Sequence, residues 1–293
     1  MSVGERDPHT GHMTTGHEWN GIKELNTPVP KPVWFFLVAT FTFAVIYWVL
    51  MPAWPYGVNY TRGLLGLDQR TIVAENVRSA AIERSVWTDR IAAANLREIQ
   101  ADPRLMQVVR EAGHALFGDN CSVCHGTDAG GGPGFPNLAQ APFLWGGDEE
   151  TVQETIRVGI NSEHPETRVS QMLAFGRDQM LARDDVKRVA TYVRSLSQPE
   201  IASMADKDEL AAGAQLFLDN CAACHGENAK GSTDAGAPDL TDRFWVYGGD
   251  ETTVTASIHG GRMGQMPSWE GRLSDVQRKL LTLYVLDLRT RQQ

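Results

Sequence analysis

The sequence predicts an all-α protein with one N-terminal transmembrane helix, a helical connector and two small helical domains in tandem. Three observations predict this fold class. One uncharged apolar run is long enough to cross a lipid bilayer. A long block of sequence occurs twice in the C-terminal two thirds of the chain. In both copies, apolar residues recur at spacings of three and four residues, which is the period of an amphipathic helix.

The predicted transmembrane helix covers residues 33–52. It contains 19 consecutive residues without a charge, from Val33 to Met51. At about 1.5 Å per residue, such a helix spans roughly 28 Å, close to the thickness of the bilayer hydrocarbon core. Tryptophan and tyrosine cluster near its ends, where the membrane interface favours them. The alternatives are a cleaved signal peptide and a buried core helix. A signal peptide fits poorly, because more than thirty mostly polar residues precede the run.

A polar tail, residues 1–32, precedes this helix, and the connector, residues 53–104, follows it. From Asp68 to Arg104 the connector is rich in Ala, Glu and Arg, which favours an amphipathic helix. Two interpretations stay open for that helix: it lies along the membrane or a partner surface, or it is a simple spacer.

All four cysteines lie in two Cys-x-x-Cys-His motifs, CSVCH at 121–125 and CAACH at 221–225. This motif is the attachment signature of c-type haem. Two thiols at this spacing reach the two vinyl groups of one porphyrin, and the adjacent histidine then reaches the iron. The sequence therefore predicts two covalently bound haem c groups. The predicted attachment and iron-binding residues are Cys121, Cys124, His125, Cys221, Cys224 and His225.

Other uses of paired cysteines fit less well. A zinc ribbon spaces its pairs by about 15–20 residues, whereas these motifs begin 100 residues apart. No βαβ pattern surrounds them, as it would in a thioredoxin-like protein, and two disulfides would not need the histidines. Because bacteria attach haem c in the periplasm, we expect the haem domains there and residues 1–32 in the cytoplasm. The predicted location is the bacterial inner membrane, crossed once.

A larger repeat surrounds these motifs. The two copies align at offsets of 100 and 102 residues, and each ends in an apolar helix. We predict one domain at 105–198 and a second at 206–290. Gly113 and Gly213 lack side chains and are expected to let two helices approach closely. The matching sequences are GHALFGDNCSVCHG (113–126) with GAQLFLDNCAACHG (213–226), and WGGDEETVQETI (145–156) with YGGDETTVTASI (247–258).

An electron-transfer haem needs a sixth iron ligand, and methionine is a usual one that raises the potential. Met172 is the candidate for the first haem, and Met266, followed by a proline, is the candidate for the second. Both follow a glutamine and lie in loop-like segments before the last helix of their copy. The alternative ligands are Met180, Met263, His114, His164 and His259.

The formal net charge of −9 argues against nucleic-acid binding, which needs a basic surface. This charge fits either the steering of a basic partner protein or simple solubility. The sequence contains no recognisable nucleophile, acid–base pair or vacant metal site, so we expect no catalytic centre on this chain itself.

Both copies resemble class I cytochrome c domains, from the helix before the motif through a Pro-x-Leu step, a methionine and a final helix. In that family the proline carbonyl accepts a hydrogen bond from the axial histidine, and the leucine packs against the haem face. The resemblance assigns these roles to Pro136, Leu138, Pro238 and Leu240. Polar partners for the haem propionates are expected in the adjoining loops, at Trp145, Tyr247, Arg168 and Arg262.

The whole chain resembles the di-haem subunit III of cbb3-type cytochrome c oxidases. The match includes HEWNGIKELNTPVP (17–30) ahead of the helix, MPAWP (51–55) at its exit and the tandem haem domains. That family implies a haem–copper catalytic subunit, a mono-haem cytochrome subunit and often a small helical subunit as partners. It also implies that electrons arrive from a cytochrome c or the bc1 complex and continue through the mono-haem subunit to the oxygen site. Leu173 departs from the pattern, because proline is expected after the first methionine.

Two other functions stay open at this point. One is an independent membrane-anchored di-haem carrier that serves another reductase or dehydrogenase. It would purify with haem c alone, whereas an oxidase complex also contains haem b and copper. The other is a di-haem peroxidase-like enzyme, which needs one haem with an open sixth position and would therefore bind carbon monoxide when reduced.

Overall fold

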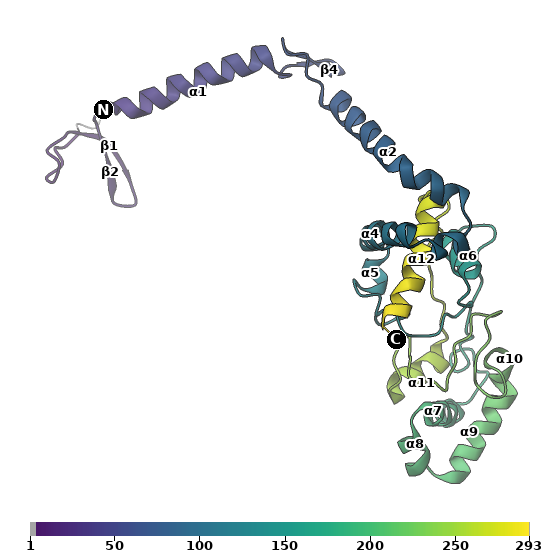
Figure 1. The fold of residues 1–293 in the computed structure, drawn as a ribbon. Helices are drawn as coiled ribbons and strands as arrows, with labels where there is room; N and C mark the ends of the chain where they lie inside the picture. The colour runs from purple at the N-terminus through teal and green to yellow at the C-terminus, as the bar shows by residue number, and fades with distance from the viewer. Residues whose placement is uncertain (1–3, 293) are drawn as a thin grey trace. The chain divides into compact units, whose positions relative to one another are not determined.

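The computed structural model describes residues 4–292, which divide into two compact units (Figure 1). The first unit extends to Glu83 and the second begins at Arg84. Apart from two short hairpins in the first unit, all regular elements in the described residues are helices. The predicted all-α fold class is therefore confirmed.

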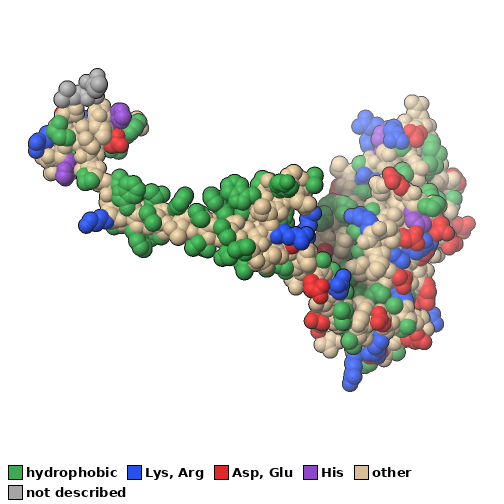
Figure 2. Space-filling model, turned by 90° about the horizontal axis from the view of Figure 1, so that it is seen from above, with side chains coloured by type: hydrophobic (Ala, Val, Ile, Leu, Met, Phe, Trp, Pro, Cys, Tyr) green, Lys and Arg blue, Asp and Glu red, His purple; other side chains and the backbone are tan. Residues whose placement is uncertain are grey.

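The first unit contains the predicted membrane helix as α1 (Lys31–Leu50). Pro32 is tolerated near its start, because the first residues of a helix make no intrahelical hydrogen bond through their backbone N–H groups. Helix α1 has a mean hydropathy of 2.2 and buries none of its residues. Figure 2 shows hydrophobic side chains all along this rod. A helix that is apolar on every side and unburied needs an apolar solvent, which a bilayer supplies.

Two hairpins flank α1, and the sequence reasoning missed both. The first pairs β1 (Thr14–Trp19) with β2 (Ile22–Leu25), and the second pairs β3 (Pro55–Tyr56) with β4 (Asn59–Tyr60). The signal for the first was present, since Asn20–Gly21 is a favoured two-residue hairpin turn and both residues have positive φ.

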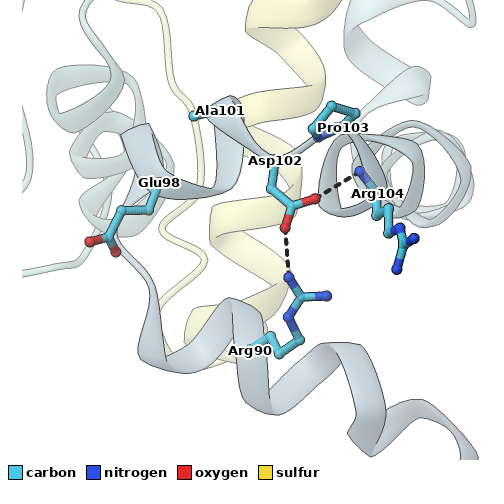
Figure 3. A pocket seen from close by; sticks show the side chains of 6 residues that line it. All are labelled: Arg90, Glu98, Ala101, Asp102, Pro103 and Arg104. Carbon is cyan, nitrogen blue, oxygen red and sulfur yellow. Dashed lines mark hydrogen bonds and ion pairs between the residues drawn. The ribbon is translucent and has the colours of Figure 1, made fainter.

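The connector is helical, as expected. Helix α2 (Gln69–Ala93) continues into the second unit, where Ile91 is fully buried. Short α3 (Leu96–Ala101) follows, with a capping box at its N-terminus. Asp102 then caps the first haem-domain helix, α4 (Pro103–Asn120), by accepting hydrogen bonds from two backbone N–H groups. The same carboxylate pairs with Arg90 at 2.6 Å, which ties α2 to α4 beside an open pocket (Figure 3).

Replacing Asp102 with alanine is expected to lower the thermal midpoint of the second unit by a few degrees, because both the helix cap and the Arg90 ion pair are lost. Asp102→Asn is the matched control, since asparagine caps equally well but carries no charge. It should lower the midpoint less than alanine does. Equal losses for the two variants would mean that the ion pair, and not the cap, stabilises this junction.

Each sequence copy contributes a helix on either side of its haem motif. After α4, the first copy contains α5 (Ser122–His125), α6 (Glu149–Val158) and α7 (Arg183–Ser197). A short helix, α8 (Pro199–Met204), joins the copies. The second copy then repeats the order with α9 (Lys207–Asn220), α10 (Ala222–His225), α11 (Glu251–Gly260) and α12 (Asp275–Gln292).

The final helices are exchanged between the copies. Helix α12, from the second copy, packs against α4 and α6 of the first, whereas α7, from the first copy, packs against α9 and α11 of the second. Figure 1 shows α12 beside α4 and α6, and α7 beside α9 and α11. The glycines expected at helix crossings take part in this exchange. A Cβ on Gly113 would lie 2.7 Å from Cβ of Tyr284 in α12, and one on Gly213 would lie 2.9 Å from Cβ of Tyr192 in α7.

The second unit therefore has two hydrophobic cores, and each is built from both copies. Core A joins the connector and α4 to α12, and core B joins α9 and α11 to α7. The predicted domains 105–198 and 206–290 describe the sequence repeat, but the packed cores do not follow those boundaries. Fully buried members of core A include Ile91, Ile99, Val109, Phe117, Leu280, Leu281 and Leu283, and those of core B include Val186, Val189, Ala190 and Phe217.

Candidate haem sites

Both Cys-x-x-Cys-His motifs form the same short helical turn at the end of a longer helix. Cys121 ends α4 and donates its N–H to the carbonyl of Phe117 at 2.8 Å, and Cys221 repeats this with Phe217 at 2.8 Å. In each turn the first cysteine is half-buried and the second is exposed. Positions three apart on a helix lie on one face, so both thiols of a motif face the same side. The arrangement suits two bonds to one flat ring.

The histidines are oriented as the cytochrome c resemblance predicts. Nδ1 of His125 lies 3.2 Å from the carbonyl oxygen of Pro136, and Nδ1 of His225 lies 3.0 Å from that of Pro238. A carbonyl only accepts hydrogen bonds, so each Nδ1 carries the proton and each Nε2 keeps a lone pair for a metal. Burial lowers the pKa of both histidines below the usual 6.5, opposed by the proline hydrogen bond. Both rings are thereby held in the neutral form that binds iron.

Burial has the opposite effect on the first cysteine of each motif. It raises the pKa of Cys121 and of Cys221 to about 11, with a further contribution from the neighbouring thiol. These thiols are therefore protonated and poor nucleophiles near neutral pH.

The leucines of the Pro-x-Leu steps line the two cores. Leu138 packs against core A together with Phe143 and Ile156, and Leu240 packs against core B together with Trp245. The guanidinium of Arg289, in α12, lies 4.5 Å from the centre of the Phe143 ring. A helix of the second copy therefore contacts the segment that follows the Pro-x-Leu step of the first copy.

The structure separates the candidate sixth ligands. Met172 and Met266 are half-buried and pack against a core, whereas Met180 is 51% exposed and Met263 is 64% exposed. The alternative histidines have other contacts: His114 pairs with the hydroxyl of Tyr284, His164 pairs with Glu270, and His259 packs against Gly176.

The polar residues expected near the propionates form two matching pairs. The guanidinium of Arg168 lies 5.1 Å from the Trp145 ring centre, and that of Arg262 lies 4.4 Å from the Tyr247 ring centre. Nε of Arg168 is buried and has no hydrogen-bond partner in the described residues. A buried donor without an acceptor is costly, and a haem propionate is an acceptor of matching charge. The residues present therefore fit a haem c group.

A charged cluster anchors the segment that follows Met266. Arg157, at the end of α6, pairs with Glu154, Glu166 and Glu270, and Glu270 also accepts a hydrogen bond from His164 at 2.8 Å. The hydrogen bonds from His164 and Arg157 lower the pKa of Glu270 to about 2. Sequence reasoning did not single out this cluster, because Glu270 is 113 residues from Arg157 and 106 residues from His164 in the chain.

At pH values above about 4.5, Glu270→Gln is expected to lower the thermal midpoint of unfolding. Below that pH, the decrease in the midpoint should become progressively smaller. A carboxylate whose pKa is lower in the folded state contributes stability that is complete above its unfolded value, 4.5, and is lost as the pH falls towards 2. The difference in thermal midpoint between variant and wild type should therefore shrink as the pH is lowered from about 6 to about 3. Glu163→Gln is the control, since Glu163 makes no ion pair in the described residues. A difference that does not change with pH would contradict the role of this charge.

Comparison with known proteins gives consistent matches along the chain. Residues 11–58 match the family model described as the N-terminal domain of cytochrome oxidase-cbb3, FixP. Residues 110–197 match the cytochrome c model, and residues 208–285 match the model for cytochrome c oxidase, cbb3-type, subunit III. Together these matches include the membrane helix and both haem motifs.

Similar proteins include three cbb3-type cytochrome c oxidase subunits that align along nearly their whole length. FixP of Bradyrhizobium sp. (strain ORS 278) is 46% identical, over 97% of this chain and 97% of that protein. FixP of Azorhizobium caulinodans is 44% identical, over 94% and 92%. CcoP of Azospirillum brasilense is 40% identical, over 98% and 99%.

Proposed function

Because the chain belongs to the family of cbb3-type cytochrome c oxidase subunits named FixP and CcoP, we propose that it carries two haem c groups and relays electrons towards the oxygen-reducing site. It is an electron-transfer subunit of that oxidase, it binds haem c, and it works in a membrane complex with other oxidase subunits. The presence of two equivalent haem motifs, each with a proline-bonded histidine, carries the proposal.

Each proposed site is held by four residues of this chain. Cys121 and Cys124 would hold the first group by thioether bonds and His125 would bind its iron. Cys221, Cys224 and His225 would do the same for the second. Met172 and Met266 are the proposed sixth ligands. When bound, haem c supplies a one-electron Fe(III)/Fe(II) couple whose potential is raised by methionine ligation.

The rest of the chain controls the surroundings of the iron. Pro136 and Pro238 keep each histidine ring in one orientation and one tautomer. Leu138 and Leu240, which pack on the two cores, would keep water from a bound haem, and Nε of Arg168, which has no partner in the described residues, would bind a propionate. A haem held by two protein ligands would change little on reduction and would leave no position for substrate, which suits electron transfer.

We further propose the direction and the partners of this electron flow. Electrons arrive from a cytochrome c or the bc1 complex, pass through the two haems, and leave through a mono-haem cytochrome subunit for a haem–copper catalytic subunit. A small helical subunit completes the assembly. The haem domains lie in the periplasm, and the tail 1–32 lies in the cytoplasm. Support comes from the resemblance to FixP and CcoP and from the haem motifs, which bacteria modify in the periplasm.

Affinity purification of the tagged chain from native membranes tests this function. The expected preparation contains haem c, haem b and copper together, consumes oxygen with a reduced cytochrome c, and yields this chain with two porphyrins by mass. A preparation with haem c alone would support the independent carrier instead. Carbon monoxide binding at a haem of this chain would overturn the proposed ligation, because it requires an open sixth position.

Protease treatment of spheroplasts tests the orientation. The C-terminal domains should be degraded from outside, while a tag at the N-terminus stays protected. Protection of the haem domains would reverse the proposed topology.

A further inference from the structure

The chain folds back onto the end of the membrane helix α1 soon after leaving it. The N–H of Leu64 donates to the carbonyl of Val49 at 2.9 Å. The N–H of Leu65 donates to the carbonyl of Leu50 at 3.1 Å. Gly63, with a φ of 69°, permits this approach, because a Cβ there would collide with the carbonyl of Leu50. The last carbonyls of a helix have no partner within it, so these two bonds close the end of α1.

The β3–β4 hairpin is attached at the same place (Figure 1). The N–H of Thr61 donates to the carbonyl of Trp54 at 2.8 Å, and the Thr61 hydroxyl oxygen accepts from the N–H of Trp54 at 3.1 Å. The ring centres of Trp54 and Trp48, which lies in the last turn of α1, are 5.1 Å apart. Residues 51–67, here called the exit segment, are therefore tied to the end of α1 by hydrogen bonds and a ring contact.

The exit segment leaves large apolar and aromatic side chains exposed. Val58, at the tip of the hairpin, is fully exposed, Tyr56 is 82% exposed and Leu64 is 79% exposed. Large apolar side chains gathered in this way mark a contact with another protein or with a membrane. The other exposed members of the segment are Trp54, Tyr60, Leu65 and Leu67.

The charge of the exit segment differs from that of the chain as a whole. Its single charged residue is Arg62, whereas the chain carries a formal net charge of −9. Arg62 is exposed and makes no ion pair in the described residues. A bilayer interface offers partners for both kinds of group, because it presents acyl carbons to apolar side chains and phosphate oxygens to a guanidinium. Tryptophan and tyrosine are also favoured at this depth.

We propose that the exit segment is a second membrane contact, lying in the interface of the leaflet where α1 ends. Its apolar side chains enter the lipid, and Arg62 binds a lipid phosphate. Lipid is the favoured occupant because α1 is itself apolar on every side and buries none of its residues, so the exit segment continues the lipid-facing surface of α1 without a break. The hydrogen bonds that close the end of α1 also favour this position, since unpaired carbonyls are costly where water is scarce.

This contact shortens the tether between the membrane helix and the second unit. Fully extended, residues 51–68 would reach roughly 60 Å. Bound at the interface, the exit segment contributes almost nothing to that reach, and the tether begins at Asp68, directly before α2, instead of at Met51. The volume that the second unit can search around its anchor is therefore smaller, which raises its effective concentration at neighbouring membrane subunits.

A nitroxide label at Val58→Cys, read by electron paramagnetic resonance in the oxidase reconstituted into phospholipid vesicles, tests this contact. Phe41→Cys, exposed in the middle of α1, provides the reference for lipid, and Met204→Cys, exposed at the end of α8, provides the reference for water. Wild-type oxidase treated in the same way gives the background. The label at Val58→Cys is expected to resemble Phe41→Cys, with higher accessibility to oxygen than to an aqueous nickel chelate. Accessibility like that of Met204→Cys would overturn the proposal. A label shielded from both reagents would show that another protein covers the segment and would also overturn it.

Charged residues introduced into the apolar part of the exit segment provide a second measurement. In Leu64→Asp/Leu65→Asp protein the backbone bonds to α1 can still form, but both exposed side chains avoid lipid. The label at Val58→Cys is then expected to become several-fold more accessible to the nickel chelate. Leu64→Met/Leu65→Met, the matched control, stays apolar and should leave this accessibility unchanged. Because both leucines are exposed, haem content and thermal midpoint should equal those of wild type in both variants. Equal chelate accessibility in the aspartate and methionine variants would overturn the proposal.

The phosphate contact is tested at Arg62. Arg62→Glu should also raise chelate accessibility at the Val58→Cys label, because a carboxylate is repelled by lipid phosphate, whereas Arg62→Lys should not. Equal accessibility in these two variants would overturn the role of Arg62.

Discussion

A chain in which Cys121 and Cys124 are both replaced by alanine is expected to carry one covalent porphyrin instead of two. The physical reason is that haem c is retained by thioether bonds, and under the proposed function this motif supplies both bonds for one group. The loss should also destabilise core A, because an empty space would be left beside His125 and Pro136, two residues before Leu138, which packs against that core. Intact mass and the haem-to-protein ratio measure the first effect, and thermal unfolding measures the second.

Val123→Ala is the matched control for this prediction. Val123 lies between the two cysteines and is 90% exposed, so its replacement should change little packing. It should retain two porphyrins and the wild-type thermal midpoint. Two porphyrins on the double cysteine variant would contradict attachment at this motif.

Gly113→Val is expected to lower the free energy of unfolding by about 2 kcal/mol or more, because the added side chain overpacks a closed helix crossing. The Cβ alone would lie 2.7 Å from Cβ of Tyr284 and 2.9 Å from Cγ, so α4 and α12 would have to separate. Thermal or denaturant unfolding of the purified holoprotein measures the loss.

Gly118→Ala tests the same helix at a site without neighbours. A Cβ on Gly118 would contact nothing within 4 Å, so alanine should raise stability by about 0.5–1 kcal/mol through helix propensity. The two substitutions in α4 are thus predicted to change the free energy of unfolding in opposite directions. A neutral Gly113→Val would mean that α4 and α12 do not cross closely at this point.

The parts of the site that depend on local sequence could be predicted. The Cys-x-x-Cys-His spacing determines a single helical turn, and the structure forms that turn at both motifs with the same hydrogen bonds. The uncharged run from Val33 determines a helix because its apolar side chains leave no polar face. The close-approach role of Gly113 and Gly213 followed from their position in helices that had to pack against another helix.

The exchange of helices could not be predicted from the sequence, because the repeat makes the alternatives chemically alike. Both final helices present a tyrosine to the glycine of a first helix: Tyr192 in α7 contacts Gly213, and Tyr284 in α12 contacts Gly113. The residues of the two copies therefore specify a close crossing of glycine and tyrosine between a first and a final helix. They do not specify which copy supplies the final helix. The choice depends on how the loops at Asn161 and Gly264 meet, which involves residues about a hundred positions apart.

Leu173 shows the limit of reasoning from a family pattern. The expected proline is missing after Met172, whereas Pro267 follows Met266. The structure nevertheless gives both methionines equivalent backbone pairs, with Arg262 and with Ile160. The position of the methionine is therefore determined by pairing to a helix end rather than by the residue that follows it.

The position of α12 in core A has a consequence for biosynthesis. The first haem motif leaves the ribosome well before the last 18-residue helix, so its surroundings stay incomplete until translation ends. During that interval the first motif lacks the packing that α12 provides to α4 and α6. A premature stop codon that deletes only α12 would accordingly remove a helix from core A, beside the first motif. Core B would keep all of its helices, although α11 is closer to the truncation in the sequence.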